Sequence, residues 1–582
     1  MSNQKKKNII FPSIVIVITI FIQVWFDLKL PELMADITSS IQSGEDMNKL
    51  TVAGLLMLLC ASGSMLSAVA TTIFTAKLAA GFSYNLRKKL FTKVIYFSKA
   101  EINKFSIPSL IVRATNDVSQ VQMFVVIGLQ LMLKAPLVSI WAITKIIGKQ
   151  KEWTITTEAT IAILFIIIIV ALILVVPKFK KMQKLQDELS RITRENLNGI
   201  SVIRAYNAEK FQQEKFNEIN EAMTKTHMFT QRTVHLILPG IQLIMGCMTL
   251  AIFLIGAYLI GDAAQTEKSF LFSEMVEFSQ YSTQIIMSFM MFIFVFVMLP
   301  RAIVSFGRLK EVFSTKNTVV NEKETIKATN DLIPIKFEHV SFKYPNENEY
   351  VIKDISFEVK KGETVAIIGS TGSGKSTIAN LIPRFYDVTS GTIFVNGVDV
   401  RKQNLTELRN KISFISQKAF LFAGTLRENI NFTNSDDDYI EEASQISEAS
   451  EFIGDLEDKY ESEVEPGGNN FSGGQKQRIS IARAIFKRPQ ILIFDDSFSA
   501  LDFKTDKKLR KNMEDKIPNT TKVIVAQRIG TIINADKIIV LEEGTIAGIG
   551  KHEDLLETCT VYHQIAESQN IVQGEFSCIN AE

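Results

Sequence analysis

Long apolar runs fill the first 300 residues of the chain, whereas the remainder alternates short apolar runs with polar turns. About 20 apolar residues let a helix cross ~30 Å of hydrocarbon. The pattern therefore predicts six membrane-spanning helices, at residues 9–27, 52–76, 121–146, 157–177, 234–260 and 271–299. Lys134 and Pro136 interrupt the third run, and they fit either a helix kink with a snorkelling lysine or a functional lysine.

The polar connections between these helices alternate in length. Two are long and rich in Lys and Arg, at residues 85–120 and 178–232, and the others are short. Because positive residues mark the cytoplasmic side, we expect the N-terminus, both long connections and the segment after Arg301 in the cytoplasm. The run after Lys5–Lys7 is predicted to be a retained helix, because no small-residue cleavage site follows it. The prediction is a multi-pass protein of the cell membrane.

From residue 335 onward the chain reads as a soluble α/β domain. Short β-rich runs at 335–342, 351–359 and 363–368 precede a glycine-rich turn. The predicted fold class is multidomain, with an all-α transmembrane domain of six helices followed by an α/β domain. The expected parts are the transmembrane domain at 1–314, a polar linker without periodicity at 315–334, the α/β domain at 335–570 and a tail at 571–582.

Composition narrows the function classes only slightly. The 582 residues exceed what one hydrophobic core holds, and the net charge of +2 gives no argument for nucleic-acid binding. No CxxC pair occurs, so neither a disulfide framework nor a zinc site is expected. The four cysteines, interpreted as buried free thiols, are Cys60, Cys247, Cys559 and Cys578.

The glycine-rich turn matches the phosphate-loop pattern GxxxxGK[ST]. It follows the apolar strand 364–368 and precedes a helix expected to begin near Lys375, which is the context that the pattern requires. Glycines let backbone N–H groups wrap phosphates, Lys375 brings a charge to the outer phosphates, and Ser376 offers a hydroxyl to magnesium. The nucleotide-binding residues expected in this P-loop domain are Gly369, Ser370, Thr371, Gly372, Ser373, Gly374, Lys375, Ser376 and Thr377.

Three further residues fit the same nucleotide. Asp495 ends a buried strand and could hold magnesium, and Gln417 follows another strand and could sense the metal or the attacking water. Tyr344 precedes the phosphate loop and could stack on adenine. A tyrosine or glutamine in isolation is usually structural, so the prediction depends on all three joining one site. The expected magnesium ligands are Ser376, Gln417 and Asp495.

A second phosphate contact is predicted at Ser472–Gln475, which reads SGGQ and opens a helix with a small capping residue. The unpaired N–H groups of a helix start attract anions. With this motif the chain resembles the ATP-binding cassette (ABC) family, specifically exporter half-transporters with one membrane domain fused to one nucleotide-binding domain. The resemblance covers almost the whole chain. Its motifs stand in family order: Tyr344, Gly369–Ser376, Gln417, Phe471–Gln475, Asp495 and Ser499–Asp502.

The resemblance implies an ATP-driven translocase with ATP and Mg²⁺ as cofactors. Such a subunit moves an amphiphilic drug-like, lipid or peptide substrate out of the cytoplasm, together with a second half-transporter. In this family two cassettes pair head to tail, so the signature helix of one subunit contacts the nucleotide of the other. Arg113–Val118 and Asn198–Tyr206 would flank the helices that couple the cassette to the membrane domain. The residues implied to act in trans are Ser472, Gly473, Gly474, Gln475 and Asp502.

Two positions depart from the family pattern. Asp496 stands where the family has the Glu that orients or deprotonates the attacking water, and Gln527 stands where the family has His. Asp is one methylene shorter, a reach deficit of roughly 1 Å that can cost on the order of a hundredfold in rate. Gln cannot carry a proton as imidazole does. The catalytic positions are Asp496, Gln527 and Gln417, and the changes at Asp496 and Gln527 resemble the degenerate subunit of heterodimeric exporters.

Two alternative functions stay open, namely a homodimeric exporter that turns over slowly and an ATP-regulated channel or regulatory membrane protein. The sixth span gives the only indication of substrate. Gln280, Gln284 and Ser288 share one helical face there, next to a run of Phe and Met residues that adapt to varied apolar guests. This face indicates either an amphiphile site or ordinary packing between helices.

Overall fold

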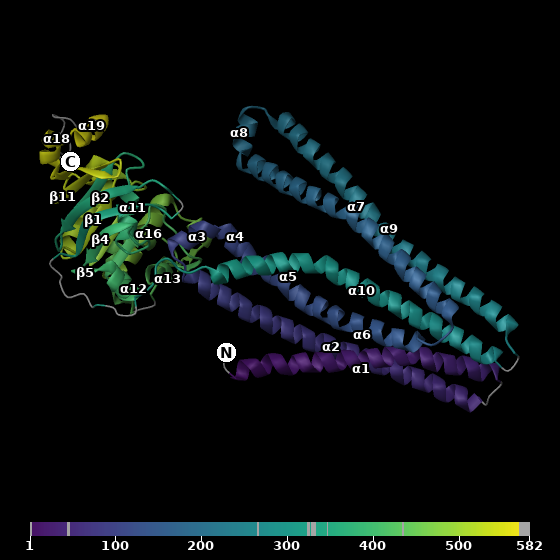
Figure 1. Ribbon diagram of the computed structural model, residues 1–582. Coiled ribbons are helices and arrows are strands. Elements are labelled where there is room, and N and C mark those ends of the chain that lie inside the picture. The colour runs from purple at the N-terminus through teal and green to yellow at the C-terminus, as the bar shows by residue number, and fades with distance from the viewer. Residues whose placement is uncertain are drawn as a thin grey trace. The chain divides into compact units, whose positions relative to one another are not determined.

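The computed structural model describes residues 3–43, 47–264, 267–322, 326, 333–345, 347–433 and 436–569. The expected tail at 571–582 and much of the expected linker lie outside these residues. The chain divides into two compact units (Figure 1). We call them the helical domain, formed by Met1–Phe91 and Ile111–Val312, and the α/β domain, formed by Thr92–Leu110 and Phe313–Glu582.

Six helical segments among the described residues are long and apolar enough to cross a membrane, which confirms the predicted spans and fold class. Five are single helices: α1 (Asn3–Gln42), α2 (Met47–Ile95), α7 (Lys151–Asn198), α9 (Glu209–Asp262) and α10 (Lys268–Ser314). The helices extend well beyond the predicted spans, because the apolar pattern marks only the part of a helix that fits a bilayer. The short helix α8 (Ile200–Ala205) joins α7 to α9.

The third span, Ile107–Ile146, is built from several pieces. Two turns of π-helix interrupt it, and such turns are frequent at functional sites. At the second turn Gly128 packs so closely on the Phe124 ring that an added Cβ would lie 2.8 Å from it. The pieces are α4 (Ile107–Val112), η1 (Arg113–Asp117), α5 (Val118–Met123), η2 (Phe124–Gly128) and α6 (Leu129–Ile146).

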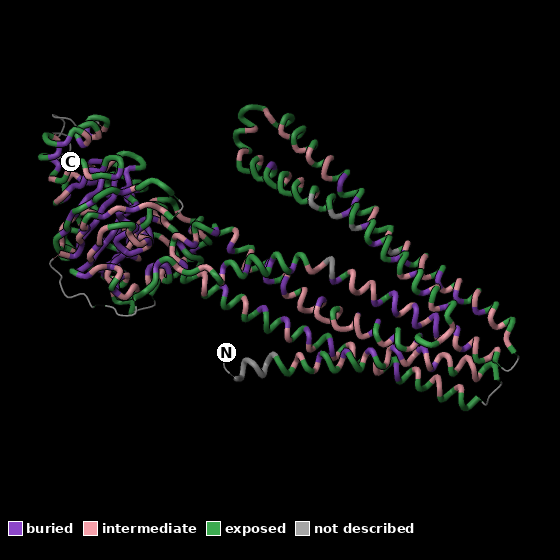
Figure 2. The backbone as a smooth tube through the Cα atoms, viewed as in Figure 1, coloured by how far each residue is buried: buried purple, intermediate pink, exposed green. Residues whose placement is uncertain are grey.

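Burial in the helical domain follows its membrane setting (Figure 2). Aliphatic and aromatic side chains such as Trp153, Phe278 and Ile285 form a core, while many large apolar side chains on the outer faces are exposed. Cys60 and Cys559 are buried as predicted, but Cys247 is exposed on α9, so the prediction is wrong there. In a span whose outer face meets lipid, an apolar thiol has no need of a protein core. Cys578 lies outside the described residues.

The α/β domain contains three sheets and the remaining helices. Its strands are β1 (Ile335–Phe342), β2 (Ile352–Val359), β3 (Thr364–Gly369), β4 (Ser390–Val395), β5 (Val398–Asp399), β6 (Ile412–Ile415), β7 (Gly424–Thr425), β8 (Glu463–Val464), β9 (Ile491–Asp495), β10 (Thr521–Val525), β11 (Lys537–Glu542) and β12 (Thr545–Gly550). Its helices are α3 (Lys99–Phe105), α11 (Lys375–Leu381), α12 (Leu405–Lys411), α13 (Leu426–Ile430), α14 (Ile440–Ile446), α15 (Ser450–Gly454), α16 (Gly473–Phe486), α17 (Phe503–Lys516), α18 (His552–Thr558) and α19 (Thr560–Ser568).

The largest sheet has the order β12-β11-β3-β10-β9-β6, and all its strands are parallel except the edge strand β12. Alternate side chains of β9 enter two cores, since Ile491 and Ile493 pack toward β1 and β2 while Leu492 and Phe494 pack toward α16. Neighbouring parallel strands end at the same edge of the sheet. The residues that follow β3, β10, β9 and β6 are therefore brought together at that edge.

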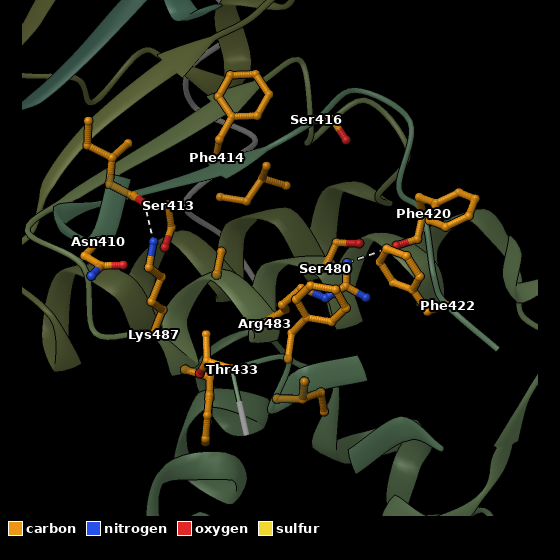
Figure 3. A pocket seen from close by; sticks show the side chains of 16 residues that line it. Asn410, Ser413, Phe414, Ser416, Phe420, Phe422, Thr433, Ser480, Arg483 and Lys487 are labelled. Atoms are coloured by element: carbon orange, nitrogen blue, oxygen red, sulfur yellow. Dashed lines mark hydrogen bonds between the residues drawn. The ribbon is translucent and has the colours of Figure 1, made fainter. Parts of the chain in front are cut away.

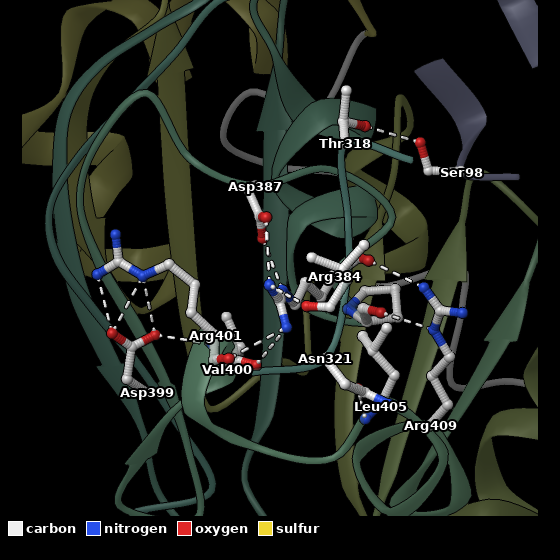
Figure 4. Close-up of polar contacts among 12 residues, drawn as sticks. Ser98, Thr318, Asn321, Arg384, Asp387, Asp399, Val400, Arg401, Leu405 and Arg409 are labelled. Carbon is white, nitrogen blue, oxygen red and sulfur yellow. Dashed lines mark hydrogen bonds and ion pairs between the residues drawn. The ribbon is translucent and has the colours of Figure 1, made fainter. Parts of the chain in front are cut away.

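The described part of the linker is held against the α/β domain (Figure 4). Thr318 hydrogen-bonds the Ser98 hydroxyl at 2.9 Å, and Asn321 Oδ1 accepts from the Leu405 backbone N–H at 2.9 Å. Arg384, only 3% exposed, pairs with Asp387 at 2.6 Å and donates to the Val320 carbonyl at 3.2 Å. A buried guanidinium satisfied on several sides fixes the path of the chain into β1.

Candidate ATP site

The phosphate loop lies between β3 and α11, and α11 begins at Lys375 as predicted. Gly372 and Gly374 have φ of 86° and 98°, which a residue with Cβ adopts only under strain. Lys375 Nζ donates to the carbonyls of Gly369 at 2.8 Å and Ser370 at 2.6 Å, and burial lowers the pKa of this ammonium. The buried Ser373 hydroxyl has no hydrogen-bond partner among the described residues. Such a loop fits phosphate oxygens as its missing partners.

Two of the three residues predicted to hold magnesium meet, whereas the third, Gln417, donates to Asp496 instead. Ser376 Oγ donates to Asp495 Oδ1 at 2.6 Å, so a hydroxyl and a carboxylate converge beside the phosphate loop. Oxygen ligands of this kind, completed by water and phosphate, are what Mg²⁺ takes. When bound, the ion would neutralise charge on the phosphates, and Ser376 and Asp495 are placed to hold it.

The sheet order explains how distant motifs share this edge. Gln527 follows β10, Asp495 ends β9 and Gln417 follows β6, and these strands are consecutive neighbours of β3. The carboxyl ends of four adjacent parallel strands therefore carry the phosphate loop and the three polar side chains. Their adjacency depends on β10 lying between β3 and β9, although β10 is the last of these four strands along the chain.

Asp496 is the centre of a hydrogen-bonded group at this edge. Its Oδ2 accepts from Gln417 Nε2 at 2.9 Å and from Gln527 Nε2 at 2.7 Å, and its backbone is left-handed with φ of 51°. Burial raises the pKa of the Asp496 carboxyl; the Gln417 hydrogen bond opposes the rise and the charge of Asp495 adds to it. Two amides, which cannot accept a proton, therefore fill Oδ2 of this carboxylate.

Comparison with known proteins gives the family. Residues 352–499 match the family described as ABC transporter, and residues 13–299 match the ABC transporter transmembrane region. The uncharacterized ABC transporter ATP-binding protein MT1311 of Mycobacterium tuberculosis is 33% identical over 550 residues, covering 94% of this chain and 93% of that protein. The chain belongs to the ABC transporter family. It is a multi-pass membrane protein with an ATP-binding domain, and the predicted resemblance to that family is confirmed.

Other relatives agree with this assignment. YfiB of Bacillus subtilis, an uncharacterized ABC transporter ATP-binding protein, is 33% identical over 555 residues, or 95% of each chain. YgaD of Bacillus subtilis, a putative multidrug export ATP-binding/permease protein, is 31% identical over 495 residues, or 84% of each chain. A bacterial Atm1-family ABC exporter solved with ATP bound has the same fold, with a TM-score of 0.78 at 21% identity over 97% of this chain and 99% of that chain.

The signature motif of this ABC transporter is a well-formed helix start. Ser472 Oγ accepts from the Gln475 N–H at 3.3 Å, and Gln475 Oε1 accepts from the Ser472 N–H at 2.9 Å, which is a capping box. Asp502 caps α17 in the same way, with Oδ1 accepting from the Thr505 N–H at 2.9 Å. Among the described residues, no hydrogen bond links Ser472–Gln475 to the phosphate loop of the same chain.

Tyr344 lies beside the phosphate-loop helix. Its hydroxyl is 3.0 Å from the Thr377 hydroxyl, and its ring packs edge-on against Phe342 and Tyr386. The side chain is half-buried, so part of the ring stays accessible. This position is compatible with the predicted adenine contact, which stays a prediction.

Two residues near the site belong to no sequence motif. Gln569, at the end of α19, makes two hydrogen bonds to the turn after β10. Its Nε2 donates to the Gln527 carbonyl and its Oε1 accepts from the Ile529 N–H, both at 2.8 Å. Lys99 of α3 donates to Asn380 Oδ1 at 2.7 Å, and Asn380 in turn donates to the Ser376 carbonyl at 2.6 Å. Neither residue belongs to a motif, so only the fold could reveal them.

An aromatic cleft of about 460 Å³ opens on the ATP-binding domain next to the strand that carries Gln417 (Figure 3). Phe420, Phe422 and Phe432 line it and are about half exposed, at 56%, 47% and 54%. Arg483 supports the wall by donating to the carbonyls of Asn429 at 2.6 Å and Phe420 at 3.0 Å, and burial lowers its pKa to about 10. Exposed aromatic rings around a formed cleft mark a contact surface.

Proposed function

We propose that this ABC transporter is one half of a heterodimeric exporter whose own phosphate loop binds ATP and barely hydrolyses it. The observation that carries the proposal is the bonding of Asp496 Oδ2 to Gln417 and Gln527. A hydrolytic site needs a carboxylate free to orient the attacking water and an imidazole near the γ-phosphate. Here the carboxylate is shorter, its oxygen is occupied, and an amide replaces the imidazole.

The signature helix, unlike the Asp496 group, keeps the residues that the family pattern has at this position. Its capping box leaves the first N–H groups of α16 directed out of the helix, and it makes no hydrogen bond to the described phosphate loop of its own chain. A helix start of this kind stabilises a phosphate held by another subunit. We therefore assign Ser472, Gly473, Gly474, Gln475 and Asp502 to the hydrolytic site of the partner, which would supply the missing Glu and His.

The aromatic cleft and α8 support a partner subunit. No side chain of α8 is buried, and the neighbouring Tyr206 is 80% exposed. A short helix with exposed Val202 and Tyr206 matches a cleft lined by exposed phenylalanines. We infer that the partner's equivalent of α8 occupies this cleft, and the basic connections support a cytoplasmic position for both.

The proposed cargo is an amphiphile that leaves the cytoplasm. The name of YgaD, a putative multidrug export protein at 31% identity, supports export. The Phe and Met residues of α10 suit an apolar tail. Ser376 and Asp495 would hold Mg²⁺ with the ATP.

Turnover of the purified chain tests the proposal. The chain alone should bind ATP through Lys375 yet hydrolyse it on the order of a hundredfold more slowly than the assembled pair, because its carboxylate is short and occupied. Binding is measured with a fluorescent ATP analogue and hydrolysis by phosphate release, with Lys375→Ala as the control that loses binding. Brisk hydrolysis by the chain alone, abolished in Lys375→Ala, would show a homodimeric exporter instead.

A further inference from the structure

Asp27 is a carboxylate on which four membrane helices converge. Lys134 Nζ of α6 lies 3.1 Å from its Oδ2, and the Ser64 hydroxyl of α2 donates to its Oδ1 at 2.5 Å. Gln284 of α10 donates to the Asp27 backbone carbonyl at 3.1 Å. The ion pair joins α1 to α6, and the hydrogen bonds of Ser64 and Gln284 add α2 and α10. An ion pair is costly in an apolar domain, so it is a candidate functional site.

On α2 and α6 the pair is far from other charged residues, whereas on α1 Lys29 and Glu32 follow Asp27 within five residues. Ser64 is near the midpoint of the uncharged stretch of α2 between Lys49 and Lys77. Lys134 is the single charged residue between Asp117 and Lys145. A helix rises about 1.5 Å per residue, so the nearest flanking charges on α2 lie about 20 Å away in either direction. The side chains are nonetheless reachable, because Lys134 is 21% and Asp27 is 28% exposed.

Two buried polar atoms beside the pair lack hydrogen-bond partners among the described residues. They are the acceptor Gln284 Oε1 and the donor Gln130 Nε2. Gln130 stands one turn before Lys134 on the same face of α6, and the π-helical turn η2 ends two residues before it. The group therefore presents one cation, one anion, one free donor and one free acceptor.

We propose that this intramembrane group binds the zwitterionic head of the transported amphiphile, an ammonium joined to an anionic group. The inference rests on the proposed export function and names the substrate class. The ammonium would lie on Asp27 and the anionic group on Lys134, while Gln130 and Gln284 receive hydrogen bonds that they lack within the chain.

The charges of Asp27 and Lys134 favour a zwitterionic head group over a singly charged one. A purely cationic head on Asp27 would leave the Lys134 ammonium unpaired in an apolar domain, and a purely anionic head on Lys134 would leave the Asp27 carboxylate unpaired. A charge left unpaired in an apolar domain is unfavourable. A zwitterion inserted into the pair gives each side chain an opposite charge, so neither is left alone.

Lipid binding by the full chain in nanodiscs tests the inference. The three tryptophans, Trp25, Trp141 and Trp153, all lie in the helical domain and serve as energy donors to lipids with one acceptor-labelled acyl chain. The head groups compared are phosphoethanolamine, phosphate and trimethylammonium. We expect the phosphoethanolamine lipid to bind about tenfold more tightly than either singly charged lipid. Lys134→Met should shift the preference to the cationic lipid, and Asp27→Asn should shift it to the anionic one.

Lys149→Met is the matched control, because Lys149 also pairs with an acid, Glu277 at 2.5 Å, outside this group. It should keep the wild-type preference. Single-chain phosphoethanolamine lipid is then added from water. If it competes with the labelled lipid, the group takes a soluble amphiphile; if it does not compete, the group takes a bilayer lipid. Either result fits the inference. Equal affinity for the three head groups in the wild type would overturn it. If ATP binding persists in that case, the proposed export function is untouched.

Discussion

Two amide side chains and one short carboxylate meet at the ATP site. Asp496 accepts from Gln417 and Gln527 through a single oxygen, so the residues that replace Glu and His also contact one another. Amides donate hydrogen bonds to a carboxylate but cannot take up a proton. These hydrogen bonds stabilise the ground state of the site. Asp496 and Gln527 are hydrogen-bonded to each other, so we expect the two replacements to act as one unit; reverting either one alone leaves the other in place.

Reverting both residues tests this coupling. Asp496→Glu with Gln527→His should raise ATP hydrolysis at this site by on the order of a hundredfold, because the longer carboxylate reaches the water and an imidazole replaces the amide. Each single change should give much less than half of that gain on a logarithmic scale. The measurement is single-turnover hydrolysis of ATP bound to the assembled pair. Additive effects of the two single changes would contradict the coupling.

The sequence could supply these residues but not their contact. Asp496 and Gln527 are 31 positions apart and meet because β10 inserts between β3 and β9. Gln569 was invisible to the motif search, since an amide at a helix end carries no pattern until the fold sets it against the turn after β10. Motifs defined by fixed local spacing, such as the phosphate loop and the SGGQ cap, allowed the start of the following helix to be predicted to the residue.

At the scale of elements, α3 is linked to the candidate ATP site through Asn380 of α11. It belongs to the first long connection between membrane helices, yet it packs within the α/β domain. The Lys99 ammonium contacts Asn380 and lies over the rings of Phe385 and Phe414, at 5.1 Å and 5.8 Å from their centroids. Burial lowers its pKa, which the Coulombic attraction of Asp495 opposes. Asn380 then holds the carbonyl of Ser376, a predicted magnesium ligand.

Removing that link should weaken ATP binding. Lys99→Met leaves Asn380 without its charged donor, so we expect about a tenfold loss in affinity of the full chain for a fluorescent ATP analogue. Lys104→Met is the matched control, because Lys104 is an exposed lysine of the same helix. It should bind as the wild type does. Equal affinities for the two variants would show that α3 is only a structural support.

Periodicity alone could not have placed α3. The run from 85 to 120 reads as one polar stretch, whereas the structure divides it between α2, α3, α4, η1 and α5 and assigns its middle to the other domain. The six spans and the strands β1 to β3 were predictable, because burial on one or both faces imposes a local pattern. Domain membership of a connection depends on contacts that no local pattern encodes.

Under the proposed function, the whole molecule is asymmetric in what it offers the two ATP sites. Its phosphate loop, Asp495 and the Asp496 group would form one half-site with altered catalytic residues, and its SGGQ helix would form an unaltered half of another. If two different chains pair head to tail, the same subunit weakens one site and completes the other. The intramembrane Asp27–Lys134 group lies in the same chain, so cargo recognition and the quiet ATP site would be contributed by one subunit.

The most direct test compares two substitutions in the assembled pair. Ser472→Ala removes the cap that this chain offers to the partner's ATP, whereas Lys375→Ala disables the phosphate loop of its own weak site. Steady-state ATP hydrolysis by the reconstituted pair should fall on the order of a hundredfold with Ser472→Ala, the scale of losing a phosphate-facing group, and only a few-fold with Lys375→Ala. A larger loss with Lys375→Ala than with Ser472→Ala would contradict the account.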